Sequence, residues 1–178
     1  MKKVLRLLHG DHFTATDLQF TYLSAGLSLV LVTAWAYPLD VGWFKHVILS
    51  LIVLDFSGGM VANMTTSTSI FYASRPKLRI LFIGCHVIQP LLLAWIFERE
   101  VWGIAVITTY TLAASLLVSA VRDSNRQRTV AMSLFLPGIF LLLLLLKTEP
   151  SVLTICLIFF MVKLIVSFPV HWGIVSTR

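Results

Sequence analysis

Long apolar runs, separated by short polar stretches, account for most of the chain. Six of these runs have the length of a membrane-spanning helix, because about 20 mostly apolar residues cross the hydrocarbon core of a bilayer. The runs cover residues 19–37, 43–63, 78–97, 101–121, 130–146 and 151–170. The stretches between them are too short for a further domain. The pattern therefore predicts one all-α transmembrane domain over residues 1–178, a six-helix bundle with sequential helices antiparallel.

The composition agrees with a lipid-facing surface. Of all residues, 58% are hydrophobic and only 12% are charged, whereas about a quarter of a soluble domain is charged. A lipid-facing surface needs few charges, because apolar side chains can point outward into the bilayer. The net charge is +6, but the basic residues lie in short clusters between the apolar runs. Nucleic acid is therefore not an expected partner.

The basic residues that flank the apolar runs lie mainly on one side of the expected membrane. Ten share the side of both chain ends: Lys2, Lys3, Arg6, Arg75, Lys77, Arg79, Arg122, Arg126, Arg128 and Arg178. Three lie on the other side: Lys45, Arg99 and Lys147. Cytoplasmic loops carry an excess of Lys and Arg. The bias therefore predicts a multi-pass protein of the cytoplasmic membrane, with its N- and C-termini both in the cytoplasm.

Two charged residues, Asp55 and Lys163, lie inside apolar runs. Counted along their helices, each lies about 18 Å below the outer surface of a core about 30 Å thick. His86 lies about 10 Å above the inner surface, which is nearly the same level. Charged groups inside a bilayer are costly and usually face the interior of a bundle. We therefore expect Asp55 to contact Lys163, with His86 close by.

Further polar residues extend this candidate site. Gln89 follows His86 by three residues and shares its face of the helix, and Pro90 weakens the hydrogen bonding of that helix. The glycine pair 58–59 permits close helix approach or a local break. Asn63 lies at the inner end of the second run. The candidate intramembrane binding site comprises Asp55, His86, Lys163, Gln89 and Asn63.

The same residues also have purely structural interpretations. Asp55 and Lys163 could be an ion pair that only sets helix packing, or Lys163 could extend towards the inner headgroups. His86 could be a core residue with one backbone partner. A zinc site needs three or more ligands, and Asp55 and His86 supply only two. No histidine pair matches in depth as two haem ligands would, so we expect neither a metal nor another cofactor.

Three basic residues at the end of the fourteen-residue stretch between the second and third runs, and just after it, form a second, weaker candidate. Arg75, Lys77 and Arg79 follow the hydroxyl-rich segment 65–69 and could contact an anionic lipid headgroup. The positive-inside rule accounts for the same charges without a ligand. Similarly, the segment Lys2–Leu8 could lie on the inner leaflet or serve only to set the topology.

Three classes of function remain open. The first is a small solute or proton-coupled carrier, in which Asp55 and His86 exchange protons and Lys163 is the counter-charge. The second is an intramembrane lipid-modifying enzyme with His86 as acid and base. The third is a non-catalytic accessory or assembly subunit, with a protein partner or a second copy beside it in the lipid. Charges near the middle of the bilayer favour the carrier.

Overall fold

The computed structural model describes residues 2–146 and 151–172, with side chains from residue 6 onward. These residues form helices and turns, with no strand among them. In chain order the helices are α1 (Lys2–His9), α2 (Ala15–Ala36), α3 (Trp43–Met64), α4 (Thr66–Ala73), α5 (Pro76–Cys85), α6 (Ile88–Ile96), the 3₁₀-helix η1 (Glu98–Glu100), α7 (Val101–Ala120), α8 (Ser124–Leu146), α9 (Val152–Met161) and the π-helix η2 (Val162–Ser167).

Five helical segments of the described chain are long and apolar enough to cross a membrane. They cover Ala15–Ala36, Trp43–Met64, Pro76–Ile96, Glu98–Ala120 and Ser124–Leu146. The last apolar segment, Val152–Ser167, is helical but shorter than these five. The prediction of an all-helical fold is thus confirmed for the described residues, and five of the helices are compatible with a multi-pass membrane protein. The sixth crossing and the cytoplasmic location of both termini stay predictions.

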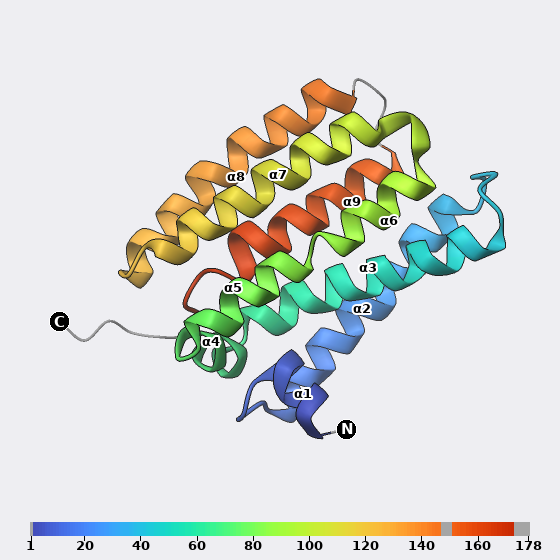
Figure 1. Ribbon diagram of the computed structural model, residues 1–178. Helices are drawn as coiled ribbons and strands as arrows, with labels where there is room; N and C mark the ends of the chain where they lie inside the picture. Colours follow the sequence, from blue (N-terminus) through green and yellow to red (C-terminus); the bar gives the residue numbers. More distant parts are fainter. Residues whose placement is uncertain (1, 147–150, 173–178) are drawn as a thin grey trace.

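The shorter segment, α9 with η2, lies inside the bundle. Helices α3, α6, α7 and α8 lie around it, and α2 packs along the outer side of α3 (Figure 1). Most of its side chains are buried, with zero exposure at Cys156, Leu157, Phe160, Met161, Leu164 and Ile165. One stripe is only partly buried, and it comprises Ile155, Ile158, Phe159, Val162 and Val166. A helix that is apolar around its whole circumference is expected in such a central position.

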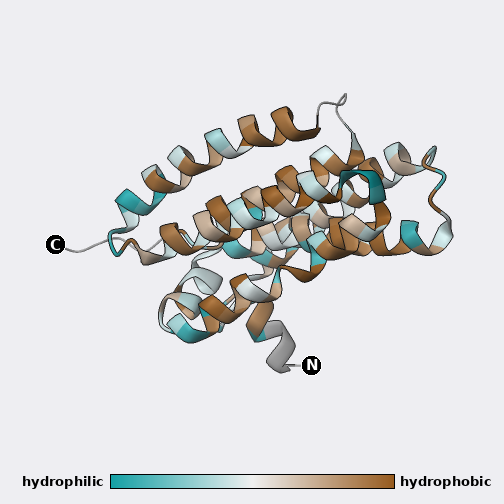
Figure 2. Cartoon of the chain, turned by 45° about the horizontal axis from the view of Figure 1, so that its top comes forward, coloured by the Kyte–Doolittle hydropathy of each residue, from teal (hydrophilic) through white to brown (hydrophobic). Residues whose placement is uncertain are grey.

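The outer faces of the long helices are apolar too. Leu27 and Leu31 of α2 and Phe140 and Leu144 of α8 are each more than half exposed. Figure 2 shows apolar residues along these faces and many of the hydrophilic residues near the ends of the helices. An exposed apolar surface of this extent matches a lipid environment.

The third apolar run does not form one continuous helix. Helix α5 ends at Cys85 and α6 begins at Ile88, and the turn between them has the tight hydrogen bonds His86 N to Ile83 O and Val87 N to Gly84 O. Pro90 explains the break, because it has no N–H to donate to the carbonyl of His86 and its ring crowds that carbonyl.

The stretch between α3 and α5, expected to be a connection, contains the eight-residue helix α4. The Thr65 hydroxyl caps it by accepting a hydrogen bond from Thr68 N at 3.3 Å. Helix α1 packs against α4 and the end of α3, where Gly10 has a φ of +77°. A Cβ atom at Gly10 would overlap the backbone of Ser67, so this close approach requires glycine.

Candidate functional site

An ion pair between Asp55 of α3 and Lys163 of η2 forms the centre of the candidate site. The Lys163 Nζ donates to Asp55 Oδ2 at 2.7 Å and to the backbone carbonyl of Asp55 at 3.1 Å. The two residues are 108 positions apart in the chain. Charge-assisted hydrogen bonds of this length are among the stronger polar contacts in proteins.

Lys163 reaches Asp55 by passing over Gly59, one turn further along α3. A Cβ atom at position 59 would lie 2.6 Å from Lys163 Cε and 2.8 Å from Nζ. Any larger residue at position 59 would therefore displace the ammonium group. The glycine expected to permit close helix approach here makes room for a charged side chain.

Gln89 completes the contacts of the Asp55 carboxylate. It lies in the first turn of α6, and its Nε2 donates to Asp55 Oδ2 at 3.0 Å. Both donors therefore converge on Oδ2, while Oδ1 accepts no hydrogen bond from the described residues. The break before α6 places Gln89 at this level as the second residue of a new helix.

His86 lies at the break itself and is 5% exposed. Its Nδ1 lies 2.6 Å from the carbonyl oxygen of Phe82. Because a carbonyl only accepts, Nδ1 carries the proton in this contact and Nε2 has the free lone pair of a neutral imidazole. His86 is within electrostatic range of both Lys163 and Asp55, although no hydrogen bond joins it to either of them.

Asn63 lies two turns beyond Asp55 on the same face of α3, about 12 Å along the helix. It is 4% exposed, and its Nδ2 has no hydrogen-bond partner among the described residues. The same holds for the hydroxyl of Ser167, which follows Lys163 by about one turn of η2. The structure thus brings Asp55, Lys163 and Gln89 into contact, with His86 nearby and Asn63 further away.

The two members of the ion pair differ strongly in exposure. The Lys163 side chain is 2% exposed, whereas the Asp55 side chain is 41% exposed. Leu51, one turn before Asp55 on the same face, is 58% exposed. Asp55 therefore lies at the outer edge of the bundle and receives its partner from the inside.

The three basic residues predicted to contact headgroups do not lie together. Arg79 is 7% exposed; it donates to the carbonyl of Pro169 and contacts His171 Nε2 at 3.0 Å. Arg75 is partly exposed beside Asp11, at 3.6 Å, and Lys77 is exposed. Only Arg75 joins a charge cluster at the surface, with Asp11 and Arg6.

Sequence reasoning missed the polar network around the last described residues. His171 N donates to Gln127 Oε1 at 3.0 Å, and Trp172 N donates to Ser69 Oγ at 2.8 Å. Gln127 is fully buried, and its Nε2 donates to the carbonyl of Val121 at 2.6 Å. A glutamine in a basic helix end gives no signal of such burial, since its partner His171 lies 44 residues away in the chain.

No group of three or more His, Cys, Asp or Glu residues in the described ranges is placed to hold a metal ion. Comparisons with protein families, with curated proteins and with solved structures find no match to this chain.

Proposed function

We propose that the protein is a small proton-coupled carrier of the cytoplasmic membrane, in which Asp55 is the group that exchanges protons. The observation that supports this most is the Oδ1 atom of Asp55, which accepts no hydrogen bond from the described residues, while Lys163 and Gln89 both donate to Oδ2. The Asp55 side chain is 41% exposed and that of Lys163 is 2% exposed, so a proton would reach the pair from the Asp55 side. The proposal requires that water contacts this carboxylate, whereas lipid covers Leu51 on the same helix face.

The buried ammonium keeps such an exchange neutral overall. When Asp55 takes up a proton, its carboxylate becomes a carboxylic acid and Lys163 loses its counter-charge. A buried ammonium without a counter-charge releases its proton, so the pair carries no net charge before or after the step. One proton has then passed from the exposed side of Asp55 to the buried side of Lys163. The free Nε2 of His86 is a suitable acceptor within electrostatic range.

Two buried polar groups lie between this pair and the end of the bundle where α3 meets α4. The Asn63 amide and the Ser167 hydroxyl follow Asp55 and Lys163 on their own helix faces, and neither has a partner among the residues described. A buried polar group without a hydrogen bond costs about 1–3 kcal/mol. Water or a polar solute on this route would form the missing hydrogen bonds, which supports access from that end.

The proposal includes the topology that the charge pattern predicts. The excess of ten basic residues over three favours a cytoplasmic location for both termini and for the α3–α4 end of the bundle. The sixth crossing then consists of α9 and η2 together with the residues up to Val170. A short central helix can complete it, because neighbouring helices cover most of its surface.

A cysteine at position 55 tests whether water reaches the pair. The variant carries Asp55→Cys and Lys163→Met, which removes both charges together, in a background with Cys85→Ala and Cys156→Ala. Leu51→Cys in the same background is the matched control, because Leu51 shares the face of Asp55 and is more exposed. A charged, membrane-impermeant thiol reagent is applied to each side of sealed vesicles.

We expect labelling at position 55 and none at position 51, because lipid rather than water covers Leu51. Folded protein with no labelling at position 55 from either side would contradict the carrier. The pair would then be a dry packing element, as in an accessory subunit. Labelling at both positions would also contradict it, since water would then cover the whole outer face of α3.

A further inference from the structure

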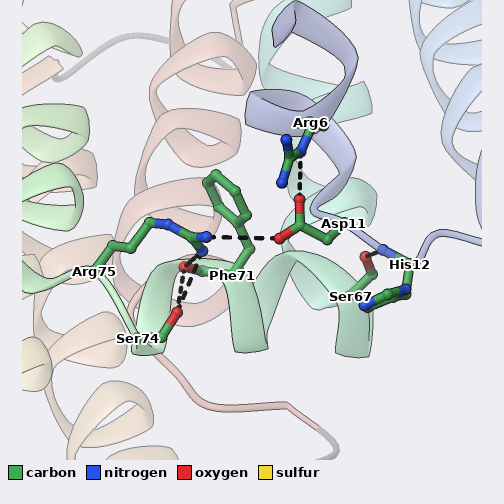
Figure 3. Close-up of polar contacts among 7 residues, drawn as sticks. All are labelled: Arg6, Asp11, His12, Ser67, Phe71, Ser74 and Arg75. Atoms are coloured by element: carbon green, nitrogen blue, oxygen red, sulfur yellow. Dashed lines mark hydrogen bonds and ion pairs between the residues drawn. The ribbon is translucent and has the colours of Figure 1, made fainter. Parts of the chain in front are cut away.

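The surface where α1 meets α4 contains two arginines joined by one carboxylate. Arg6 Nε contacts Asp11 Oδ1 at 2.5 Å, and Arg75 Nη2 lies 3.6 Å from Asp11 Oδ2 (Figure 3). The side chains are 58% exposed for Arg6, 41% for Arg75 and 27% for Asp11. Two positive groups, one from α1 and one from the turn between α4 and α5, thus converge on one accessible carboxylate.

This surface, called the α1–α4 corner below, is held together by contacts that do not involve these charged groups. The Tyr72 hydroxyl donates to the carbonyl of Leu7 at 2.9 Å, and His12 N donates to Ser67 Oγ at 2.9 Å. Burial raises the pKa of Tyr72 to about 12, so this hydroxyl remains a donor at neutral pH. Helix α1 is therefore held against α4 whether or not Asp11 bridges the arginines.

Arg75 is oriented independently of Asp11. Its guanidinium lies over the Phe71 ring at 4.0 Å, and Nη1 donates to the Phe71 carbonyl at 2.9 Å and to Ser74 Oγ at 3.3 Å. Nη2 remains directed to Asp11 at a distance longer than a hydrogen bond. One N–H group of a fixed guanidinium is therefore open to a better acceptor.

Two hollows adjoin this pair of arginines. One, of about 300 Å³, is lined by Arg6, Leu7, Phe71 and Arg75. The other, of about 250 Å³, also contains the polar groups of His12, Ser67 and Ser74. Around them the surface is apolar, with Leu7 42%, Leu8 49% and Ile70 51% exposed. The α1–α4 corner thus combines cationic groups with exposed aliphatic side chains at the end of a membrane bundle.

We propose that the α1–α4 corner binds the phosphate of an anionic phospholipid between Arg6 and Arg75, and that Asp11 is an internal competitor for the same two guanidinium groups. Arginine matches phosphate oxygens in geometry and charge. The exposed Leu7, Leu8 and Ile70 contact the acyl region. A free phosphate would have no use for these apolar residues, so the occupant is a lipid. This site is separate from Asp55 and does not depend on the carrier function.

The test uses the full-length protein in a mild detergent, titrated with dioctanoyl phosphatidylglycerol and followed by native mass spectrometry. Dioctanoyl phosphatidylcholine and inorganic phosphate are the comparison probes. Arg75→Gln and Arg6→Gln should each weaken phosphatidylglycerol binding about tenfold, as expected for the loss of one charged hydrogen bond. Asp11→Asn should strengthen it, because the competing carboxylate is removed.

Arg126→Gln is the matched control, since Arg126 is an exposed arginine paired with a carboxylate, Asp123, in a different part of the molecule. It should leave the affinity unchanged. Equal binding of the two lipids, or equal loss in Arg75→Gln and Arg126→Gln, would overturn the proposal. Weaker binding in Asp11→Asn would overturn the competitor role, and binding of inorganic phosphate as tight as the lipid would exclude a lipid-specific site.

Discussion

Lys163 has a single source of acceptors among the described residues, which is Asp55. Both hydrogen bonds of its ammonium end on that residue, one on the carboxylate and one on the main chain. The Phe56 ring, 5.7 Å away, adds only a weak attraction. Asp55 has the second donor Gln89 and an exposed edge. The Lys163 ammonium therefore depends on Asp55 for its hydrogen bonds more than the Asp55 carboxylate depends on Lys163.

This difference predicts unequal effects of single substitutions. Asp55→Asn leaves a buried ammonium without its counter-charge and should lower the stability by about 3 kcal/mol. Lys163→Met leaves a half-exposed carboxyl that keeps Gln89, so its effect should be smaller. The double variant should be milder than Asp55→Asn alone. Thermal unfolding in detergent measures all three, and equal melting temperatures for the single and double variants would contradict an energetically important pair.

Gly59→Ala should disrupt the same pair without changing any charge. The added methyl group would overlap the end of the Lys163 side chain, which is flexible and can move aside only by leaving Asp55. We expect a loss of stability similar to that of Asp55→Asn, because the buried ammonium would lose its partner in both variants. Gly26→Ala of α2 is the control, because nothing lies within 4 Å of its added Cβ. That change should be neutral or stabilising by up to about 1 kcal/mol. A Gly59→Ala variant as stable as the control would contradict this packing.

The interruption between α5 and α6 positions Gln89 in a way that an unbroken helix would not. The chain forms a tight hydrogen-bonded turn at His86, and a new helix then begins whose first turn contains Gln89. The feature was predictable in kind, since Pro90 removes one hydrogen bond. The break lies one turn before Pro90 because the carbonyl of His86 is the group affected there. This carbonyl has no N–H donor at position 90, and the proline ring crowds it.

Pro90→Ala should close the interruption and move Gln89 away from Asp55. The new N–H group can donate to the His86 carbonyl, and a helical turn stabilised by about 1 kcal/mol should slow exchange of the neighbouring backbone amides about fivefold. Hydrogen–deuterium exchange over residues 86–91 measures this. Pro137→Ala is the control, because Pro137 lies inside α8 without breaking it. Unchanged exchange in Pro90→Ala would show that the break has another cause.

The segment after η2 should make the stability depend on pH. Burial, and then the charge of Arg79, lower the pKa of His171 below its usual value. The unfolded chain, with a histidine pKa of about 6.5, therefore binds more protons than the folded protein as the pH falls below that value. The melting temperature should fall from pH 7 towards pH 5, and His171→Gln should reduce the slope. Burial also lowers the pKa of His9, so part of the slope should remain. An unchanged slope in His171→Gln would contradict the assignment.

For the molecule as a whole, the sequence was most informative about two features: the long apolar runs, and the depth of charged residues within those runs. The apolar runs located the long helices, and counting residues from the expected surfaces placed Asp55 and Lys163 at one level. The Arg6–Asp11–Arg75 cluster was not predictable, because its members come from a turn and two helix ends that carry no shared pattern. Helix α4 was missed because Thr and Ser favour turns as well as helix starts.

The proposed topology predicts which surface positions react from outside intact cells. Cysteine at Asp40 should react with an impermeant reagent, whereas cysteine at Asn125 should react only after the membrane is opened. Both residues are exposed in loops or at a helix end, which makes them a matched pair. A reporter protein fused after Arg178 should be cytoplasmic. A reporter on the outside would mean an odd number of crossings and would exclude α9 and η2 as the sixth.

The central position of α9 has a consequence for biosynthesis. Synthesis proceeds from the N-terminus, so the helices that surround α9 leave the ribosome before it does. Until α9 and η2 pack between them, these helices lack the central part of the hydrophobic core, and Asp55 has no ammonium partner. In the proposed topology α9 and η2 form the sixth crossing, and Lys163 makes this segment insert poorly by itself. Its insertion then depends on capture by helices that are already in the membrane, and the core of the bundle forms only after these helices have been synthesised.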